Sequence, residues 1–173
     1  MGLWISKHTN CNAFELDEIY WFINRKEHTK TRENTYAQLM ISRKPRQMLG
    51  FNVDRTNSAV SMQQLVDSSP LAENYYTDGN FTYLDVDFFD RHRQNFHNKN
   101  DTYNIESINS DLRHYIPGLA RRRKTFYRSL TTFRAVLSVF VNAYNKFGEA
   151  KMQWQSTTKQ KYPDPPFSVL DYL

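Results

Sequence analysis

The sequence predicts a single α/β domain in which a mixed β-sheet is flanked by helices, and three observations carry this prediction. Strand-like runs fill the first third of the chain, a short strand-like run lies near its middle, and the last third has apolar residues at helical spacing. The 173 residues, 39% of them hydrophobic and 15% aromatic, suffice to bury a core. We expect a lead-in at 1–13, the domain at 14–150, and a tail packed on its surface at 151–173.

Three strands open the predicted domain. Residues 14–24 are rich in bulky and aromatic side chains, which is typical of a strand. The charged residues 25–34 include no apolar side chain and predict an exposed loop. Residues 35–41 and 47–53 follow as strands joined by a turn at the SRKPR run, so the three strands form an antiparallel meander.

The middle of the chain contributes a helix and a fourth strand. Residues 58–68 predict a short helix, and residues 74–77 predict a short strand. Residues 81–89 fit either a strand or a helix. Residues 92–102 are polar and have almost no apolar side chain to anchor them, so we expect a mobile connection there.

Two helices complete the predicted order. The first begins at Asn104 and is separated from the second by Pro117 and Gly118. The second carries an apolar stripe with three- and four-residue spacing between 130 and 144. The resulting order, β-β-β-α-β-α-α, is that of an RNase H-like fold, which combines an antiparallel meander with parallel strands. We therefore predict an RNase H-like mixed sheet.

The charge pattern indicates an anionic partner. The net charge is +5, and no Asp or Glu occurs between Leu112 and Gly148, where many Arg and Lys residues gather. A nucleic acid fits better than a membrane surface, because the basic residues precede the apolar helix instead of lining its polar face. Cys11 is the only cysteine and excludes an internal disulfide. With no long apolar run either, we expect a cytoplasmic protein with no membrane partner.

Three carboxylates occupy the places where an RNase H-like sheet carries its catalytic residues. Asp17 lies on the first strand, Asp78 follows the fourth strand, and Glu106 lies on a later helix. Position alone leaves alternatives open for each. Asp17 could point to solvent or pair with an arginine, Asp78 could belong to a type I′ turn with the following glycine, and Glu106 could lie on an ordinary solvated face.

Neighbouring residues add to these alternatives. Asp85, Asp87 and Asp90 compete with Asp78 as metal ligands, since carboxylate oxygens suit hard divalent cations. On the predicted helix, Asn109 and Arg113 lie three and seven residues after the glutamate and share one face with it. That face would look along the sheet toward the other carboxylates.

Three sequence segments resemble the catalytic blocks of DDE transposases, most closely those of the insertion sequence one type. They are LDEIYWFI around Asp17, YYTDGNFTY around Asp78, and NIESINSDLRHYIPGLARRRKTFYRSL around Glu106. The third block is highly specific, the second is moderately specific, and the first is weak alone. Because all three segments occur in this order, the resemblance favours Asp78 over its acidic neighbours as the catalytic residue.

This resemblance implies a prokaryotic mobile-element enzyme that cleaves DNA at the ends of an insertion sequence. The freed 3′-hydroxyl would then join target DNA, in recombination that depends on two Mg²⁺ ions or on Mn²⁺ as a substitute. Asp17, Asp78 and Glu106 would hold the metals. The residues implied in DNA binding are Asn109, Arg113, Arg121, Arg122, Arg123, Lys124 and Arg128.

One departure from the family concerns DNA targeting. Members carry an N-terminal zinc-binding and helix-turn-helix region that reads the element ends, and this chain has no cysteine pair for zinc. We expect the chain to be either the downstream product of two reading frames that are joined by frameshifting or a truncated copy. It could use an upstream DNA-binding region and act as a homodimer. The alternatives are an RNase H-like nuclease that cuts without joining and a non-catalytic DNA-binding fragment of a transposase.

Overall fold

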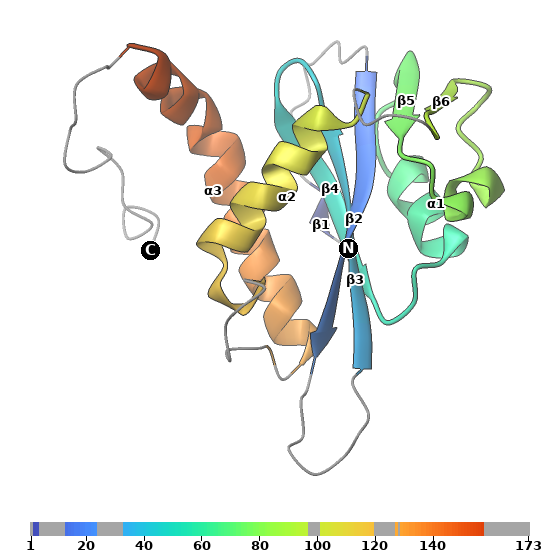
Figure 1. Ribbon diagram of the computed structural model, residues 1–173, viewed down its shortest axis with the longest axis horizontal. Helices are drawn as coiled ribbons and strands as arrows, with labels where there is room; N and C mark the ends of the chain where they lie inside the picture. Colours follow the sequence, from blue (N-terminus) through green and yellow to red (C-terminus); the bar gives the residue numbers. More distant parts are fainter. Residues whose placement is uncertain are drawn as a thin grey trace.

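The computed structural model describes residues 2–3, 13–23, 33–96, 101–119, 127 and 129–157 of the chain. A mixed sheet forms its centre, and helices pack on both faces of the sheet (Figure 1). In chain order the elements are β1 (Gly2–Leu3), β2 (Ala13–Ile23), β3 (Glu33–Ser42), β4 (Gln47–Asp54), α1 (Ala59–Asp67), β5 (Asn74–Thr77), the 3₁₀ helix η1 (Phe81–Asp85), β6 (His92–Gln94), α2 (Tyr103–Tyr115), the 3₁₀ helix η2 (Pro117–Leu119) and α3 (Leu130–Thr157). The expected α/β class with a mixed sheet is confirmed.

The strand order explains how distant parts of the sequence come together. The described part of the sheet has six strands in the order β1-β4-β3-β2-β5-β6. Strands β2, β3 and β4 form the expected antiparallel meander. Strand β5 lies parallel to β2, with Leu16 opposite Thr77, and β6 lies parallel to β5. The C-terminal end of β5 therefore lies beside the middle of β2.

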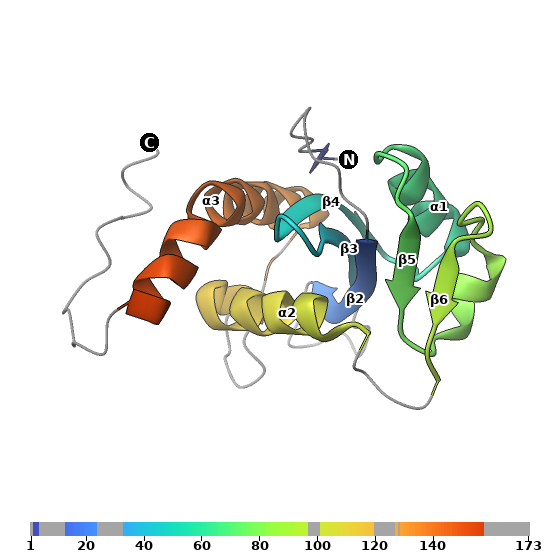
Figure 2. The same cartoon turned by 90° about the horizontal axis from the view of Figure 1, so that it is seen from above.

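The side chains of β2 alternate between two separate cores. Ile19 and Trp21 are buried with α2 and α3, whereas Phe14 and Leu16 are buried with α1 and the chain around η1. Figure 2 shows this division, with α2 and α3 on one side of the sheet and α1 on the other. Because the meander is buried on both faces, a polar residue on β2 must find a partner on one helix layer or the other.

Helix α3 packs against β4 and also forms hydrogen bonds with its backbone. The predicted stripe at 130–144 faces the core, and three of its residues are fully buried: Phe133, Leu137 and Val141. One turn later, Asn145 accepts a hydrogen bond from the Met48 N–H at 2.7 Å and donates one to the Met48 carbonyl at 2.8 Å. Arg134 donates to the Val53 carbonyl at 2.6 Å.

Three segments differ from the sequence-based expectation. Residues 92–102, expected to be a mobile connection, include strand β6, where the His92 ring stacks on Phe88 with centroids 4.3 Å apart. The ambiguous residues 81–89 begin as η1 and continue without regular structure. The lead-in contributes β1, which pairs with β4 at the far edge of the sheet.

The C-terminal boundary also differs from the expected position. We expected the domain to end at 150, but α3 continues through this point to Thr157. Residues 158–173, which include most of the expected surface tail, lie outside the described part of the chain. None of the described helices is both long and apolar enough to cross a membrane.

Candidate active site

Asp17 lies in the middle of β2, on the face covered by α2. It follows the same two-residue alternation as Ile19 and Trp21, which are buried against that layer. Its Oδ2 accepts a hydrogen bond from the Asn109 side-chain amide of α2 at 2.7 Å. Its Oδ1 accepts one from the Glu18 N–H at 2.8 Å. Asp17 is therefore half-buried against α2 and does not point into open solvent.

Asp78 directly follows the last residue of β5. Thr77 pairs with Leu16 in the parallel ladder, so the chain leaves the sheet beside Asp17. The Asp78 Oδ1 accepts a hydrogen bond from the Asn80 N–H at 3.0 Å, which fixes the local bend. A type I′ hairpin does not form here, because β5 leads into η1 and its next strand neighbour is parallel.

Glu106 lies in the first turn of α2. The adjacent Ile105 and the following Ile108 are fully buried, and they fix this helix on the sheet. Asn109, 3% exposed, lies one turn after Glu106 and is the residue that contacts Asp17. Residues three apart on a helix are neighbours, so Glu106 shares the face of α2 that meets β2 at Asp17.

The charges of Asp78 and Glu106 affect the ionisation of Asp17. The pKa of Asp17 is raised from 3.8 to about 7, first by burial and then by the negative charges of Glu18, Asp78 and Glu106. The hydrogen bond from the Glu18 N–H opposes this rise. The structure thus brings Asp78 and Glu106, which come from two other elements, within electrostatic reach of Asp17.

The donor chemistry around Asp17 fits a hard divalent cation. Carboxylate and amide oxygens are the ligands that Mg²⁺ and Mn²⁺ prefer. The buried Oδ1 of Asn109 has no hydrogen-bond partner, and it belongs to the side chain that contacts Asp17. Among the described residues, however, no three His, Cys, Asp or Glu side chains are already close enough together to hold a metal ion.

The residues implied in DNA binding fall into two groups. Asn109 is buried and donates to Asp17, so its position suits support of the carboxylates better than direct contact with DNA. Arg113 lies half-buried in the last turn of the same helix. The remaining five lie outside the described residues: Arg121, Arg122, Arg123, Lys124 and Arg128.

The rival acidic residues are exposed to solvent. Asp85, Asp87 and Asp90 are exposed, at the end of η1 and in the chain that follows it. The Asp87 Oδ1 accepts a hydrogen bond from the Phe89 N–H at 2.8 Å, which is a local turn contact. Of the acidic residues between 78 and 90, only Asp78 contributes to the electrostatic environment of Asp17.

Glu18 has a role that sequence reasoning missed. As the residue after Asp17 on a strand, it points to the opposite face of β2. It accepts hydrogen bonds from Asn57 at 3.0 Å, from the Tyr83 hydroxyl at 2.7 Å and from Asn80. Because Asn80 also binds Asp78 through its N–H, Glu18 ties the chain after β5 to β2. These partners are 39 to 65 positions away, and no local pattern signals them.

Glu15 is the second carboxylate that sequence reasoning missed. Its side chain is 1% exposed, and it forms an ion pair with the Nε of Arg43 at 2.7 Å. Its position on the Asp17 face, two residues earlier, is the one signal that the sequence offered.

No protein-family model matches the chain, and no curated protein matches it either.

Proposed function

We propose that this chain is the catalytic domain of a DDE transposase of the insertion sequence one type, with an RNase H-like fold. The observation that supports it best is the approach of Asp17, Asp78 and Glu106 from a strand, a strand end and a helix. These are the three places at which the resemblance implies the catalytic carboxylates.

The topology supports the proposed fold. An RNase H-like sheet has a three-strand meander, then a helix, then a strand parallel to the first strand of the meander. Here β2, β3 and β4 are the meander, α1 follows, and β5 lies parallel to β2. The helix with the last carboxylate would be α2, which packs on the face of β2 opposite α1.

The proposed chemistry is phosphoryl transfer on DNA. Asp17, Asp78 and Glu106 would hold two Mg²⁺ or Mn²⁺ ions, which when bound supply Lewis-acid activation of the attacking oxygen and stabilisation of the leaving oxygen. The raised pKa of Asp17 fits a site built for added positive charge, because burial and then the negative charges of Glu18, Asp78 and Glu106 disfavour its ionised form.

The contribution of the chain itself is to hold these side chains in place. Asn109 orients the Asp17 carboxylate through its 2.7 Å hydrogen bond. Glu18 and Asn80 restrain the backbone that carries Asp78. The basic stretch between 112 and 148 would bind phosphates on both sides of the scissile bond, which fixes the position of the DNA but not its sequence.

The test is nicking and strand joining on supercoiled plasmid with Mg²⁺ or Mn²⁺. We expect activity that depends on the metal, is lost in Asp78→Asn, and is retained in the matched control Asp85→Asn, an exposed aspartate at the end of η1. Equal activity in both variants and wild type would remove Asp78 from the proposed site.

The same assay separates the alternatives. Cutting without joining would indicate a nuclease and not a transposase. DNA binding that depends on salt but is indifferent to metal and to Asp78→Asn, with no cutting, would indicate a non-catalytic fragment.

A further inference from the structure

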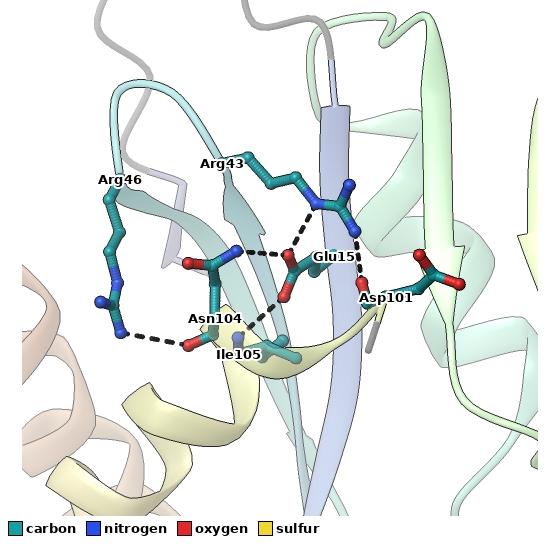
Figure 3. Close-up of polar contacts among 6 residues, drawn as sticks. All are labelled: Glu15, Arg43, Arg46, Asp101, Asn104 and Ile105. Carbon is teal, nitrogen blue, oxygen red and sulfur yellow. Dashed lines mark hydrogen bonds and ion pairs between the residues drawn. The ribbon is translucent and has the colours of Figure 1, made fainter. Parts of the chain in front are cut away.

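Glu15 on β2 is buried at the start of α2, and both of its carboxylate oxygens accept hydrogen bonds there. Its Oε1 accepts from Arg43 Nε at 2.7 Å and from Asn104 Nδ2 at 2.7 Å. Its Oε2 accepts from the backbone N–H of Ile105 at 2.9 Å. Figure 3 shows these three donors converging on one carboxylate from the turn after β3 and from the first turn of α2.

This carboxylate serves as the N-terminal cap of α2. The first N–H groups of a helix have no partner within the helix, and a side-chain oxygen at the N-cap residue commonly accepts one of them. The N-cap residue of α2, Thr102, makes no such bond. Glu15 instead accepts the Ile105 N–H from a neighbouring strand, and its negative charge also suits the positive end of the helix dipole.

The turn between β3 and β4 holds the same helix end from a second side. The guanidinium of Arg43 lies 3.6 Å from the centre of the Tyr76 ring and donates to the Asp101 carbonyl. Arg46 donates to the Asn104 carbonyl at 3.3 Å. The first turn of α2 is thus fixed to β2 and to this turn by polar contacts, in addition to the buried apolar residues of the helix.

We propose that Glu15 is a positioning residue: it fixes the first turn of α2 so that Glu106 is held beside Asp17. This inference rests on the proposed function for the role of Glu106, but its geometry does not. Glu106 directly follows Ile105, whose N–H is held, and Asn109 contacts Asp17 one turn later. The helix face is therefore attached to β2 at two points, and Glu106 lies between them.

The test separates positioning from overall stability by replacing the whole ion pair. The double variant Glu15→Leu with Arg43→Met exchanges two paired charges for apolar side chains of similar size, a change that commonly preserves global stability. Glu15→Gln is the conservative variant, because its amide oxygen can still accept the Ile105 N–H. Glu73→Gln, an exposed glutamate before β5, is the matched control.

Two spectroscopic readouts report on α2 directly. In the double variant we expect hydrogen exchange of the Ile105 and Glu106 amides to become at least tenfold faster, with exchange in the sheet core unchanged. We also expect the side-chain NH₂ resonances of Asn109 to move toward those of a solvated amide. Glu15→Gln should recover most of both effects, and Glu73→Gln should show neither.

A third readout concerns metal use. The Mn²⁺ concentration for half-maximal plasmid nicking should rise at least fivefold in the double variant, with the rate at saturating Mn²⁺ reduced less.

Unchanged exchange and Asn109 resonances, or exchange that accelerates equally across sheet and helices, would overturn the positioning role. Inactive wild-type protein would instead count against the proposed function, while the exchange data would still decide the role of Glu15. If the double variant does not fold, Glu15→Asp replaces it: its shorter side chain keeps the charge but should withdraw from the Ile105 N–H.

Discussion

Two carboxylates on one strand, Glu15 and Asp17, occupy opposite electrostatic environments. They lie two residues apart on the face of β2 that α2 covers. Glu15 is almost fully buried but has an ion pair and two further donors. Asp17 is less buried and accepts hydrogen bonds from Glu18 N–H and Asn109, and its pKa is raised to about 7, first by burial and then by the negative charges around it.

This difference separates a carboxylate that supports the fold from one suited to chemistry. Burial alone does not distinguish them, since the more buried residue is the one whose charge is better compensated. A carboxylate kept among other negative charges costs stability, and residues of this kind gather at functional sites. We therefore expect opposite effects: removal of the Asp17 charge should lower activity but not stability, whereas removal of the cation beside Glu15 should lower stability.

The largest expected effect is on catalysis. Asp17→Asn should lower metal-dependent plasmid nicking by at least about 10²–10³-fold, the range seen when a single group that stabilises a transition state is removed. Its unfolding free energy at pH 7 should be equal to or above that of the wild type, because the change removes a negative charge that burial and the neighbouring carboxylates disfavour. Nicking rates and urea denaturation measure the two quantities. A variant that is active or less stable would mean that Asp17 is a structural carboxylate like Glu15.

Removal of the cation beside Glu15 should produce the largest loss of stability. Arg43→Ala leaves a buried carboxylate without its ion pair and should lower the free energy of unfolding by about 3 kcal/mol. Arg93→Ala, at an exposed arginine of β6, serves as the control and should change it by less than about 0.5 kcal/mol. Urea denaturation monitored by circular dichroism measures both. Equal, small effects would show that the ion pair contributes little to the fold.

The ionisation of Asp17 should make the free energy of unfolding depend on pH. Its pKa is 3.8 in the unfolded reference and about 7 in the folded chain, so the folded chain binds more protons between these values. This group therefore makes stability fall as pH rises from about 4 to about 7. The free energy of unfolding should fall by about 2 kcal/mol across this interval. This is less than the full difference in pKa would give, because solvent that reaches a half-buried group screens part of the interaction.

Asp17→Asn is the control for this pH effect. The difference in unfolding free energy between the variant and the wild type should grow across the same pH interval and stay constant above it. Denaturation at a series of pH values measures it. A difference that does not vary with pH would mean that Asp17 ionises with an ordinary pKa.

The smallest expected effect concerns the opposite face of β2. Tyr83→Phe removes the buried hydroxyl that donates to Glu18 at 2.7 Å and should lower the unfolding free energy by about 1 kcal/mol, because two amides still donate to that carboxylate. Tyr103→Phe, at a tyrosine 61% exposed, should be neutral. Thermal denaturation compares the two. A neutral Tyr83→Phe would show that the amides alone hold Glu18.

The parts of the fold that the sequence predicted are those with strong local patterns. The meander, the strand at 74–77 and the stripe of α3 each carry a run of apolar or aromatic side chains at the right period. Strand β6 could not be predicted, because it is polar and depends on the β5 backbone and on the stacking of His92 on Phe88. Tertiary pairing formed this strand, without support from local propensity.

The candidate site shows the same limit. Position left Asp17, Asp78 and Glu106 ambiguous, and the resemblance to a family selected them. The residues that hold them were missed, because the contacts of Glu15 with α2 span 89 and 90 positions and those of Glu18 span up to 65. A sequence shows which carboxylates are unusual, but their partners emerge only when the elements pack.

The contacts of α3 along β4 bear on a different property, the tendency of sheets to join edge to edge. A long outer strand offers free N–H and C=O groups that can recruit a strand from another molecule. Here Asn145 occupies both polar groups of Met48, Arg134 occupies the Val53 carbonyl, and β1 pairs with the residues between them. At the opposite margin, β6 is only three residues long. The described sheet thus leaves little template for aggregation, even though its meander is long and rich in apolar residues.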